Sequence, residues 1–445
     1  MNNSNYNEAA LAIELSKSVV SKRTGIIQEC IEIMNENFDP KLYFYTTKMA
    51  DTSKYHNFNK CHSNNGGAGI TRNGAMAAAI GESIERYCSS IYDSKDLVYA
   101  SYNELKGKAI EPERWALFSN SQYSIDNFLY KKYDCDTKIN WVEGESLISN
   151  KKVYVPASFV YLPYTSSVYE KLISPCISTG LSAGISFESA VLGGIYEAVE
   201  RDSISIMWLN KLSMPTINPY GDSRFLKKII EEKIQCDNAT YKLIDITTDL
   251  DIPVIFSVKK FNSAKGKSAS CGAACRLDPE QAALKAITEA AQGAKWIQYL
   301  HAQDWSWGYN DEFSDITEFQ DHIHLYSLPE MVDKLDFVYK DNTFKDISTI
   351  NNYSTNDNKK DLDACLSMLE AKGYDVIVKD VTSSDIEQIG YHVYKVLIPG
   401  LHQLQGNHNY PFLGGERLKE VPKILGYKNE YSERGNYNKQ PHPFP

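Results

Sequence analysis

One charged pattern, Glu-x-x-Glu-Arg, occurs twice in this chain, each time among apolar and small residues. The two copies comprise Glu82, Glu85, Arg86, Glu197, Glu200 and Arg201. On a helix, positions i, i+3 and i+4 share one face, so each copy stacks two carboxylates beside a guanidinium. A helix that is apolar on most faces is buried, and buried charges have to be paired or bind a metal ion. A solvated ion-pair face is the alternative for a single copy, but its repetition in two apolar helices favours a shared, protected site.

Three long helices are predicted to carry these and related charges. The first runs from about residue 72 to 91, and the second from 187 to 209 with Ser186 as its N-cap. The third begins at Asp278-Pro279, because Asp is favoured at a helix N-cap and Pro at the first helical position.

The third helix adds another charged stripe. Lys285, Glu289 and Gln292 stand at i, i+4 and i+7, which is again one face. Clustered carboxylates repel one another, so two or more pairs in one site imply bound Mg²⁺. Bound Mg²⁺ in turn implies a polyphosphate ligand.

The remaining elements predict an α/β (α+β) protein. Strands are expected at 41–47, 141–147, 153–164, 241–247, 253–261, 268–275, 375–381 and 391–400. A further helix is expected at 361–372. The Asn-, Asp-, Ser- and Lys-rich stretch 340–360 predicts a surface loop, and Gly-rich 66–69, which lacks the Gly-Lys-Ser/Thr of a Walker loop, predicts a turn.

We expect one large body between two simpler ends. Residues 1–16 are polar and predict a flexible N-terminus, and residues 17–430 predict a single catalytic domain with subdomains. Residues 431–445 end in Pro-His-Pro-Phe-Pro, which fits neither a helix nor a central strand and predicts an extended tail.

Composition excludes several classes of protein. The net charge of −10 is opposite to that of a protein that neutralises nucleic-acid phosphates. The start has no secretory signal, and no run of 18 apolar residues exists, so we expect no membrane segment. Nine scattered cysteines suit a reducing compartment, and we expect a cytoplasmic protein.

Long stretches of the chain resemble the YcaO family in order and spacing. They are GAGITRNGAMAAAIGESIERYCSS, STGLSAGISFESAVLGGIYEAVERD, CGAACRLDPEQAALKAITEAAQ, VYKVLIPGLHQLQ and FLGGERLKEVPKILG. The terminal PHPFP resembles the PxPxP end of azoline-forming members, the cyclodehydratase (D protein) components of thiazole/oxazole-modified peptide biosynthesis. The resemblance covers roughly residues 20 to 445. It implies a YcaO fold, with mixed sheets in ferredoxin-like subdomains around a non-P-loop ATP site.

The resemblance also implies an activity and its residues. Members use ATP to activate backbone amides of ribosomally made peptides, so we expect ATP and Mg²⁺ as cofactors. The metal-binding residues would be Glu82, Glu85, Glu197, Glu200 and Glu289. Nucleotide contacts would come from Lys22, Arg23, Arg86, Ser182, Arg201, Lys285 and Gln292. The catalytic tail would present Pro441, Pro443 and Pro445.

Some positions depart from the family's pattern. Ile185 stands where many members have Asn, Ser189 where many have a second Glu, and Lys285 where Arg is usual. Ala79 and Gly193 replace polar motif residues. A thioamide or amidine synthase of the family would share the ATP site and is one alternative to a cyclodehydratase, although the terminal PHPFP argues against it. The changes at Ile185, Ser189 and Lys285 leave a non-catalytic scaffold that docks a peptide as a second alternative, although the two intact Glu-x-x-Glu-Arg copies argue against it.

The resemblance implies partners as well. A ribosomal precursor peptide would be the substrate, and a ubiquitin-activating-enzyme-like protein would bind its leader. An FMN-dependent dehydrogenase is a further candidate partner, and a homodimer is the expected assembly.

Overall fold

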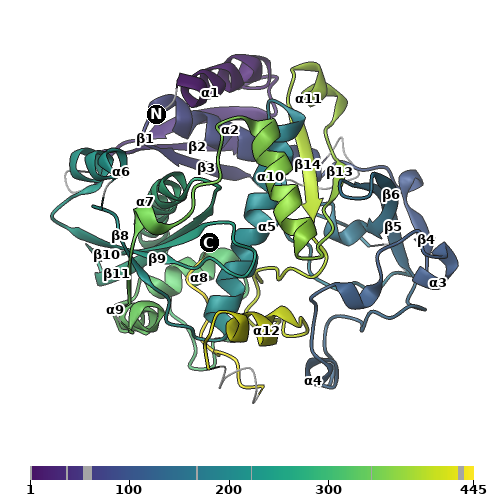
Figure 1. Cartoon of the computed structure of the whole chain (residues 1–445). Coiled ribbons are helices and arrows are strands. Elements are labelled where there is room, and N and C mark those ends of the chain that lie inside the picture. The colour runs from purple at the N-terminus through teal and green to yellow at the C-terminus, as the bar shows by residue number, and fades with distance from the viewer. Residues whose placement is uncertain are drawn as a thin grey trace.

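The structure is a computed structural model. It describes residues 3–36, 39–53, 63–166, 169–221, 223–341, 343–428 and 435–444. The α-helices are α1 (Asn3–Leu15), α2 (Arg72–Ser89), α3 (Tyr102–Leu105), α4 (Asn120–Tyr123), α5 (Phe187–Leu209), α6 (Arg224–Ile229), α7 (Pro279–Gln303), α8 (Phe319–Tyr326), α9 (Pro329–Val332), α10 (Asn358–Ala371), α11 (Ser384–Gln388) and α12 (Arg417–Ile424). Figure 1 shows α5 near the centre of the molecule, with α1 and α2 towards one side and α12 towards the other.

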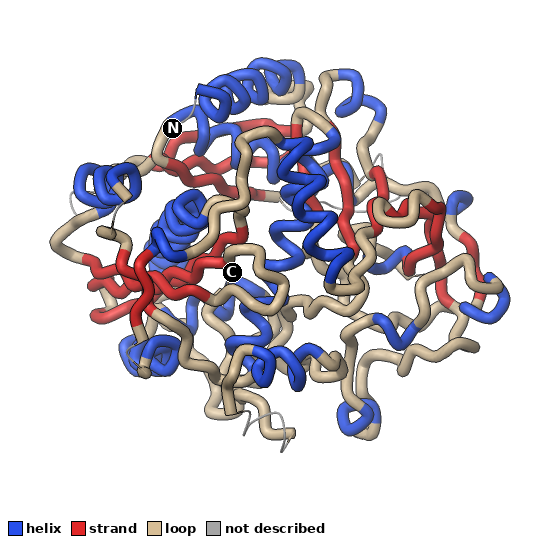
Figure 2. The backbone as a smooth tube through the Cα atoms, viewed as in Figure 1, coloured by secondary structure: helices blue, strands red, loops and turns tan. Residues whose placement is uncertain are grey.

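The strands form three separate sheets. The first has the antiparallel order β1 (Ile27–Ile33), β2 (Tyr43–Met49), β3 (Asn64–Gly69). The second has the order β11 (Gly266–Cys275), β10 (Val254–Ser263), β9 (Ala239–Asp245), β8 (Thr216–Asn218), β12 (Phe344–Asp346), in which only the β8–β12 pair is parallel. The third has the order β4 (Val98–Ala100), β5 (Ile139–Ser146), β13 (Ile377–Asp380), β14 (His392–Leu397), β7 (Leu181–Gly184), and β6 (Lys151–Pro156) also pairs with β5. This mixture of helices and sheets confirms the predicted α/β class (Figure 2).

Each of the three long helices directly follows a strand of a different sheet. β3 leads into α2, β7 into α5 and β11 into α7. Thr71, Ser186 and Asp278 cap the three helices by accepting hydrogen bonds from first-turn backbone N–H groups. The predicted caps at Ser186 and Asp278 are therefore confirmed.

A strand glycine lets each helix pack close to its own strand. A Cβ atom added to Gly67 would lie 2.3 Å from the Ala75 carbonyl oxygen of α2, and one added to Gly272 would lie 2.4 Å from the Ala286 carbonyl oxygen of α7. One added to Gly184 would lie 2.6 Å from the Ala190 nitrogen of α5. The Gly-rich stretch 66–69 is thus part of β3, and the turn predicted there is wrong, because the glycines serve helix contact rather than chain reversal.

The helix α5 forms the centre of the core. It packs on β7 and β14 of one sheet and on β11 of another, and most of its residues are buried. The helix α2 is buried mainly on the side that faces its strands, with Ala75, Ala79 and Ile80 inaccessible. The prediction that both helices are apolar on most faces therefore holds for α5 and only in part for α2.

Two predicted segments differ from the structure. Residues 1–16, expected to be flexible, instead contain α1, where Ala12 and Leu15 pack against the neighbouring core and the Ala12 carbonyl accepts a hydrogen bond from the Tyr391 hydroxyl. The strand predicted at 153–164 ends at Pro156, since proline cannot donate to the ladder, and a 3₁₀ turn follows at Ala157–Phe159.

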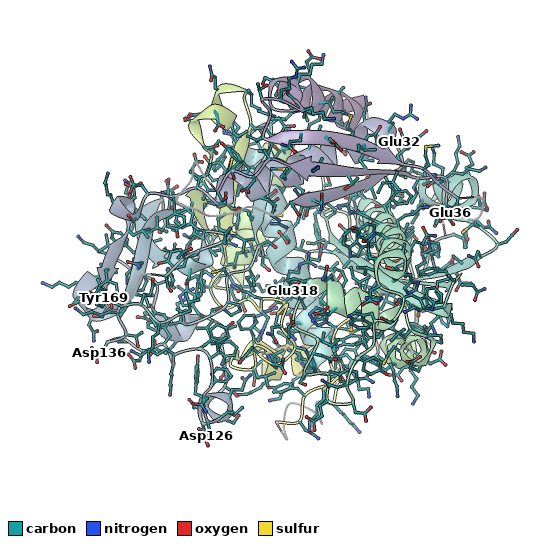
Figure 3. All side chains as sticks on the ribbon, turned by 180° about the vertical axis from the view of Figure 1, so that it is seen from behind. Glu32, Glu36, Asp126, Asp136, Tyr169 and Glu318 are labelled. Atoms are coloured by element: carbon teal, nitrogen blue, oxygen red, sulfur yellow. The ribbon has the colours of Figure 1, made fainter. Side chains whose placement is uncertain are left out.

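Several acidic side chains lie at the outer edges of the molecule. Figure 3 shows Glu36, Asp126 and Asp136 projecting from the outer edges of the molecule. The stretch 340–360 is mostly loop, as predicted, with the short strand β12 inside it.

Candidate functional site

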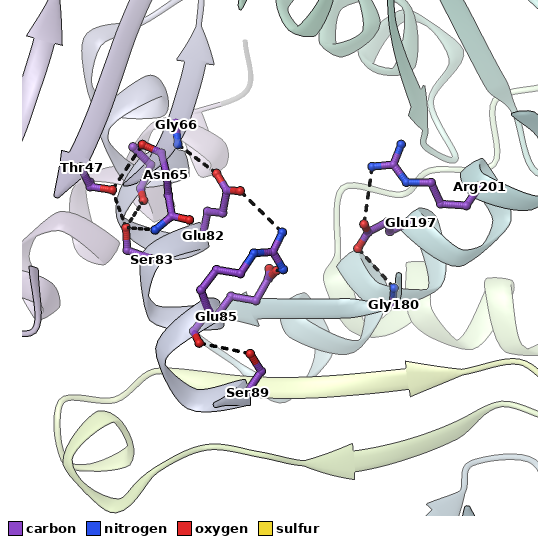
Figure 4. A network of polar contacts seen from close by, with 12 residues as sticks. Thr47, Asn65, Gly66, Glu82, Ser83, Glu85, Ser89, Gly180, Glu197 and Arg201 are labelled. Carbon is purple, nitrogen blue, oxygen red and sulfur yellow. Dashed lines mark hydrogen bonds and ion pairs between the residues drawn. The ribbon is translucent and has the colours of Figure 1, made fainter. Parts of the chain in front are cut away.

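The first copy of the repeated motif forms a compact ion-pair group on α2. Arg86 Nη1 lies 2.7 Å from Glu85 Oε1, and Arg86 Nη2 lies 3.6 Å from Glu82 Oε1. The backbone N–H of Gly66, on β3, donates to Glu82 Oε2 at 3.1 Å (Figure 4). The strand and the arginine together fix the first carboxylate.

The second copy repeats this geometry on α5. Arg201 Nη1 lies 3.2 Å from Glu200 Oε1, and Arg201 Nη2 lies 3.6 Å from Glu197 Oε1. The Gly180 N–H, just before β7, donates to Glu197 Oε2 at 3.2 Å (Figure 4). The Cys275 N–H, at the end of β11, donates to Glu200 Oε2 at 3.3 Å. The second copy thus contacts two different sheets.

The third helix contributes the predicted stripe. Lys285 Nζ lies 2.5 Å from Glu289 Oε1. Gln292 Nε2 lies so close to Gly66 that a Cβ there would be 2.6 Å away. The stripe on α7 therefore reaches the same β3 glycine that bonds Glu82.

Electrostatic coupling joins the three helices into one site. Burial raises the pKa of Glu85, on α2, to about 8, and the negative charge of Glu197, on α5, adds to the rise. Burial likewise raises the pKa of Glu200 to about 8, and the charge of Glu289, on α7, adds to it. Both carboxyls are shielded from solvent, with side-chain exposures of 14% and 9%. These carboxylates therefore lie within electrostatic reach of one another, and their service in one shared site stays a prediction.

A buried lysine lies beside the site and was not predicted. Lys395, on β14, is 1% exposed and donates a hydrogen bond to the Ile177 carbonyl oxygen at 2.8 Å. Burial lowers its pKa to about 8, while the charges of Glu197 and Glu85 oppose that shift. The only signal in the sequence was a charged residue inside an otherwise apolar strand.

A buried polar network supports the α2 copy from behind (Figure 4). Ser83 Oγ lies 2.7 Å from Thr47 Oγ1 and accepts a hydrogen bond from Asn65 Nδ2 at 3.2 Å. The network links β2, β3 and α2, and Asn65 and Ser83 directly neighbour Gly66 and Glu82. Neither the network nor the glycine N–H donors could be found from spacing alone.

Several departures from the family's pattern have a structural explanation. Ser189 closes a capping box with Ser186, each backbone N–H bonding the other side chain, which is the role a longer polar residue can take at that position. Gly193 leaves room for Ser182, whose Oγ would lie 2.3 Å from a Cβ at Gly193. Ser182, on β7, thus faces α5 one turn before Glu197. Ile185 packs against a hydrophobic cluster.

Two basic residues near the N-terminus were predicted to contact the nucleotide. Lys22 and Arg23 are exposed in the turn between α1 and β1. Within the described ranges, no ion pair joins either of them to the carboxylates of α2, α5 or α7. Their predicted role at the nucleotide stays a prediction.

The C-terminal tail enters the molecule beside α5 (Figure 1). His442 and Phe444 are each 1% exposed, so this part of the tail is docked rather than solvated. The guanidinium of Arg201 lies over the Phe444 ring, 5.0 Å from its centroid. Pro441 and Pro443 lie in this docked segment, whereas Pro445 and residues 431–434 fall outside the described residues.

The chain belongs to the YcaO family. The family model, described as YcaO cyclodehydratase, ATP- and Mg²⁺-binding, matches residues 66–402. A protein of Methanothermobacter thermautotrophicus, itself uncharacterized, is 24% identical over 341 residues, which are 75% of this chain and 80% of that protein.

Solved structures show the same fold. A heterocyclase in complex with substrate and cofactor has a TM-score of 0.78 at 23% identity, over 98% of this chain and 57% of that chain. The YcaO protein of Methanopyrus kandleri, bound with AMPPCP and Mg²⁺, has a TM-score of 0.62 at 19% identity, over 89% and 91%. The E. coli microcin synthetase complex McbBCD with pro-MccB17 bound has a TM-score of 0.57 at 17% identity, over 86% and 90%. The chain thus spans little more than half of the first heterocyclase.

ATP and Mg²⁺ are the cofactors of this family, and the carboxylates present suit them. Among the residues that the structure describes, no three His, Cys, Asp or Glu side chains already form a metal cluster. Mg²⁺ is usually held by one or two carboxylates together with phosphate oxygens and water, so ion-paired carboxylates of this kind can fit it without a preformed cage. In the same ranges, every helix is too short or too polar to cross a bilayer.

Proposed function

We propose that this chain is an ATP-dependent cyclodehydratase that converts Cys, Ser or Thr of a ribosomal precursor peptide to thiazoline or (methyl)oxazoline rings. The side-chain thiol or hydroxyl adds to the preceding backbone carbonyl carbon and loses its proton. The former amide oxygen attacks the γ-phosphate of ATP and releases ADP. Loss of phosphate together with the proton of the former amide N–H then forms the C=N bond of the ring, so one ATP removes the elements of one water from the peptide.

The observation that carries this proposal is the convergence of the two Glu-x-x-Glu-Arg copies. We assign Mg²⁺ binding to Glu82, Glu85, Glu197, Glu200 and Glu289. Mg²⁺ supplies charge neutralisation for phosphoryl transfer when bound. The raised pKa values of Glu85 and Glu200 support this assignment, because closely spaced buried carboxylates are costly without a cation.

The cationic and polar groups around the carboxylates have complementary roles. Arg86, Arg201 and Lys285 hold the carboxylates in place through ion pairs and supply positive charge for phosphate oxygens. We assign further nucleotide contacts to Ser182, Gln292, Lys22 and Arg23.

The tail would act on the peptide rather than on the nucleotide. We assign Pro441, Pro443 and Pro445 to this tail, because a proline fixes φ near −65° and so limits the conformations that such a segment can adopt. The contact of Phe444 with Arg201 brings the docked tail to the second carboxylate copy. We propose that the docked tail orients the attacking side chain of the peptide.

We further propose that a separate ubiquitin-activating-enzyme-like protein presents the precursor peptide and that an FMN-dependent dehydrogenase oxidises the rings. The multi-protein microcin synthetase complex with bound pro-MccB17 supports a division of labour of this kind. A homodimer in the cytoplasm remains the expected assembly and place of action.

Ring formation tests the proposed function. A synthetic Cys/Ser/Thr-rich peptide is incubated with the chain, ATP and Mg²⁺, alone and with a ubiquitin-activating-enzyme-like protein that binds the leader of the peptide. Each ring should lower the peptide mass by one water and release one phosphate. Glu85→Gln and Glu200→Gln should each reduce the rate of ring formation at least about 100-fold. Glu370→Gln, on the exposed face of α10, is the matched control.

Different outcomes separate the alternatives. Sulfur incorporation or loss of water between an amine and an amide would favour a thioamide or amidine synthase. Normal phosphate release by Glu85→Gln and Glu200→Gln would contradict the assignment of the site. Absence of Mg²⁺-dependent nucleotide binding by the wild-type chain would favour a non-catalytic scaffold.

A further inference from the structure

A polar cavity of about 670 Å³ opens beside the C-terminal end of α2. Its walls come from three parts of the chain, namely Tyr161, the segment 91–96 that follows α2, and the segment 379–383 at the end of β13. A volume of this size can hold a small ligand or part of a peptide. Among the described residues that line it, none is assigned to ATP, Mg²⁺ or the tail.

The hydroxyl of Tyr161 faces this cavity without a partner. The side chain is 6% exposed and lines the cavity, and no hydrogen bond joins its hydroxyl to another residue in the described part of the chain. Buried polar groups are almost always hydrogen-bonded, so an unpaired hydroxyl that still reaches a cavity is available to a ligand.

A carboxylate without an ion pair lies beside this hydroxyl. Asp96 is exposed, and no cation among the described residues pairs with it, whereas Lys95 Nζ lies 3.9 Å from Asp93 Oδ2. Burial raises the pKa of the Tyr161 phenol, and the negative charge of Asp96 adds to the rise, so the two groups lie close together. They offer a ligand two acceptor groups side by side.

Aromatic rings form one side of the cavity. Tyr92, which also lines it, stacks on Tyr161 with ring centroids 4.5 Å apart and planes 24° apart, and Tyr164 continues the stack at 5.6 Å. Tyrosine rings attract cations, and the planar guanidinium of arginine stacks on them. A guanidinium also carries five N–H donors in one plane, so it can reach a carboxylate and a phenol oxygen together.

The other charges of the cavity suit a peptide backbone. Asp380 already accepts the Thr382 N–H at 2.9 Å and the Tyr394 hydroxyl at 3.1 Å. Lys379 lines the cavity and has no ion-pair partner within the described ranges. This ammonium group would repel a lone cation but can donate to a carbonyl oxygen, and a peptide with a basic side chain carries both groups.

We propose that this cavity binds an arginine side chain of a peptide. Asp96 and the Tyr161 hydroxyl accept N–H groups of the guanidinium, and the Tyr92 ring stacks on it. Lys379 donates to a backbone carbonyl of the same peptide.

The cavity is a neighbour of the carboxylate site. Ser89 ends α2 one turn after Glu85, and the cavity begins at Ile91 (Figure 4). Lys379 of β13 is the cross-strand partner of Lys395 of β14. A peptide in the cavity would therefore lie close to the site of ring formation. That this peptide is the precursor rests on the proposed function; binding of the arginine side chain does not.

Binding of a blocked tripeptide tests the cavity without any activity assay. Acetyl-Gly-Arg-Gly-amide is titrated into the full-length chain, and its dissociation constant is measured by ligand-observed NMR. Citrulline in place of arginine keeps the shape and removes the charge, so it should weaken binding at least about tenfold, the factor for a hydrogen bond between charged groups. Asp96→Asn should cause a similar loss, and Tyr161→Phe a loss of about fivefold, the factor for one neutral hydrogen bond.

Each variant has a matched control. Tyr133→Phe removes another buried hydroxyl that has no partner among the described residues, from the same core cluster as Tyr161. Asp126→Asn removes another exposed carboxylate. Neither residue lines the cavity, so neither change should alter binding. Circular dichroism confirms that every variant is folded.

Saturable binding that weakens with citrulline, in Asp96→Asn and in Tyr161→Phe, but not in the two controls, supports the proposal. Absence of saturable binding, equal binding of the citrulline peptide, or unchanged binding in both cavity variants overturns it. Binding of free arginine without binding of the blocked peptide also overturns it, because the site would then take an amino acid. If the peptide binds as expected while the wild-type chain forms no ring, the cavity stands and the proposed function fails.

Discussion

The two copies of Glu-x-x-Glu-Arg have the same internal geometry but different surroundings. In both, the arginine pairs with two carboxylates, and the first carboxylate accepts a glycine N–H, at 3.1 Å in one copy and 3.2 Å in the other. The helix α2 packs mainly on the three-stranded sheet and less extensively on β7 and β14, and it leaves the side at Gly81 open. The α5 copy lies between two larger sheets and contacts the tail through Arg201.

The residue that follows each arginine shows the difference most clearly. After Arg86 comes Tyr87, whose hydroxyl donates to the exposed Asp385 at 2.8 Å. After Arg201 comes Asp202, which is fully buried and pairs with Arg417 of α12 at 2.7 Å. The motif thus determines the local charge geometry, and its neighbours determine what each copy is coupled to. The α5 copy is tied to the C-terminal part of the chain.

The largest loss of stability is expected when the ion pair between Asp202 of α5 and Arg417 of α12 is removed. Arg417→Met leaves Asp202 and Asp249 without their shared partner and should reduce the free energy of unfolding by about 3–5 kcal/mol, because an unpaired buried charge is costly. Tyr87→Phe should cost only about 1 kcal/mol, since Asp385 is solvated. Chemical denaturation measures both. Lys372→Met, which removes an exposed pair with Asp251, is the control, and equal losses in the two copies would contradict the difference drawn between them.

A smaller loss of stability is expected when a larger residue crowds the contact between β3 and α2. Gly67→Ala places a methyl group within 2.4 Å of two backbone atoms of α2, so strand and helix have to separate. We expect a cost of about 1–3 kcal/mol and a weaker site, since Gly66 would move away from Glu82. Thermal unfolding and nucleotide binding measure the two effects. An unchanged melting temperature would show that β3 does not fix α2.

Acid should weaken the tail side of the α5 copy. Burial lowers the pKa of His322 to about 4 and lowers that of His442 as well, against about 6.5 in an unfolded chain. The unfolded state therefore binds more protons in this window, so stability is full above pH 6.5 and is lost as the pH falls towards 4. His408 and Asp321 also face His322.

Denaturation midpoints at pH 7.5 and pH 5 measure this dependence. Replacement of His322 by Asn should flatten the slope between these two values. A slope that is unchanged in that variant would show that His322 does not carry the acid sensitivity.

The smallest expected effect is a gain in stability from a substitution at Gly81, on the open side of α2. A Cβ at Gly81 would meet nothing within 4 Å, so Gly81→Ala should stabilise the helix by about 0.5–1 kcal/mol. At Gly194, in α5, the same atom would lie 2.5 Å from Val396, so Gly194→Ala should destabilise. The melting temperatures of the two variants are compared with that of the wild-type chain. A change in the same direction in both variants would contradict the difference in packing between Gly81 and Gly194.

Periodicity identified the charged faces and the helices that carry them. The predicted helix 187–209 matches α5, and Lys285, Glu289 and Gln292 lie on one stripe as expected. These features depend on local spacing and capping, which a single sequence contains. The strand β3 was missed because its glycines have low strand propensity and are explained only by the close approach of α2.

Long-range contacts could not be predicted in the same way. Lys395 lies far in sequence from its partner Ile177, and a charge inside an apolar strand does not identify that partner. Trp208 and Tyr326 donate to the carbonyl oxygens of the C-terminal tail, and nothing local distinguishes them from ordinary core residues. The helix α1 was missed because its apolar residues are few and gain stability only by packing on another element.

Titration calorimetry with AMPPCP and Mg²⁺ tests most directly whether the two copies form one site. We compare the wild-type chain, Glu85→Gln, Glu200→Gln and the double variant, with Glu370→Gln as control. Each single variant should lose most of the Mg²⁺-dependent binding, and the double variant should lose little more, because both carboxylates serve the same bound nucleotide. Binding at wild-type strength in either single variant, or losses that simply add, would contradict a shared site.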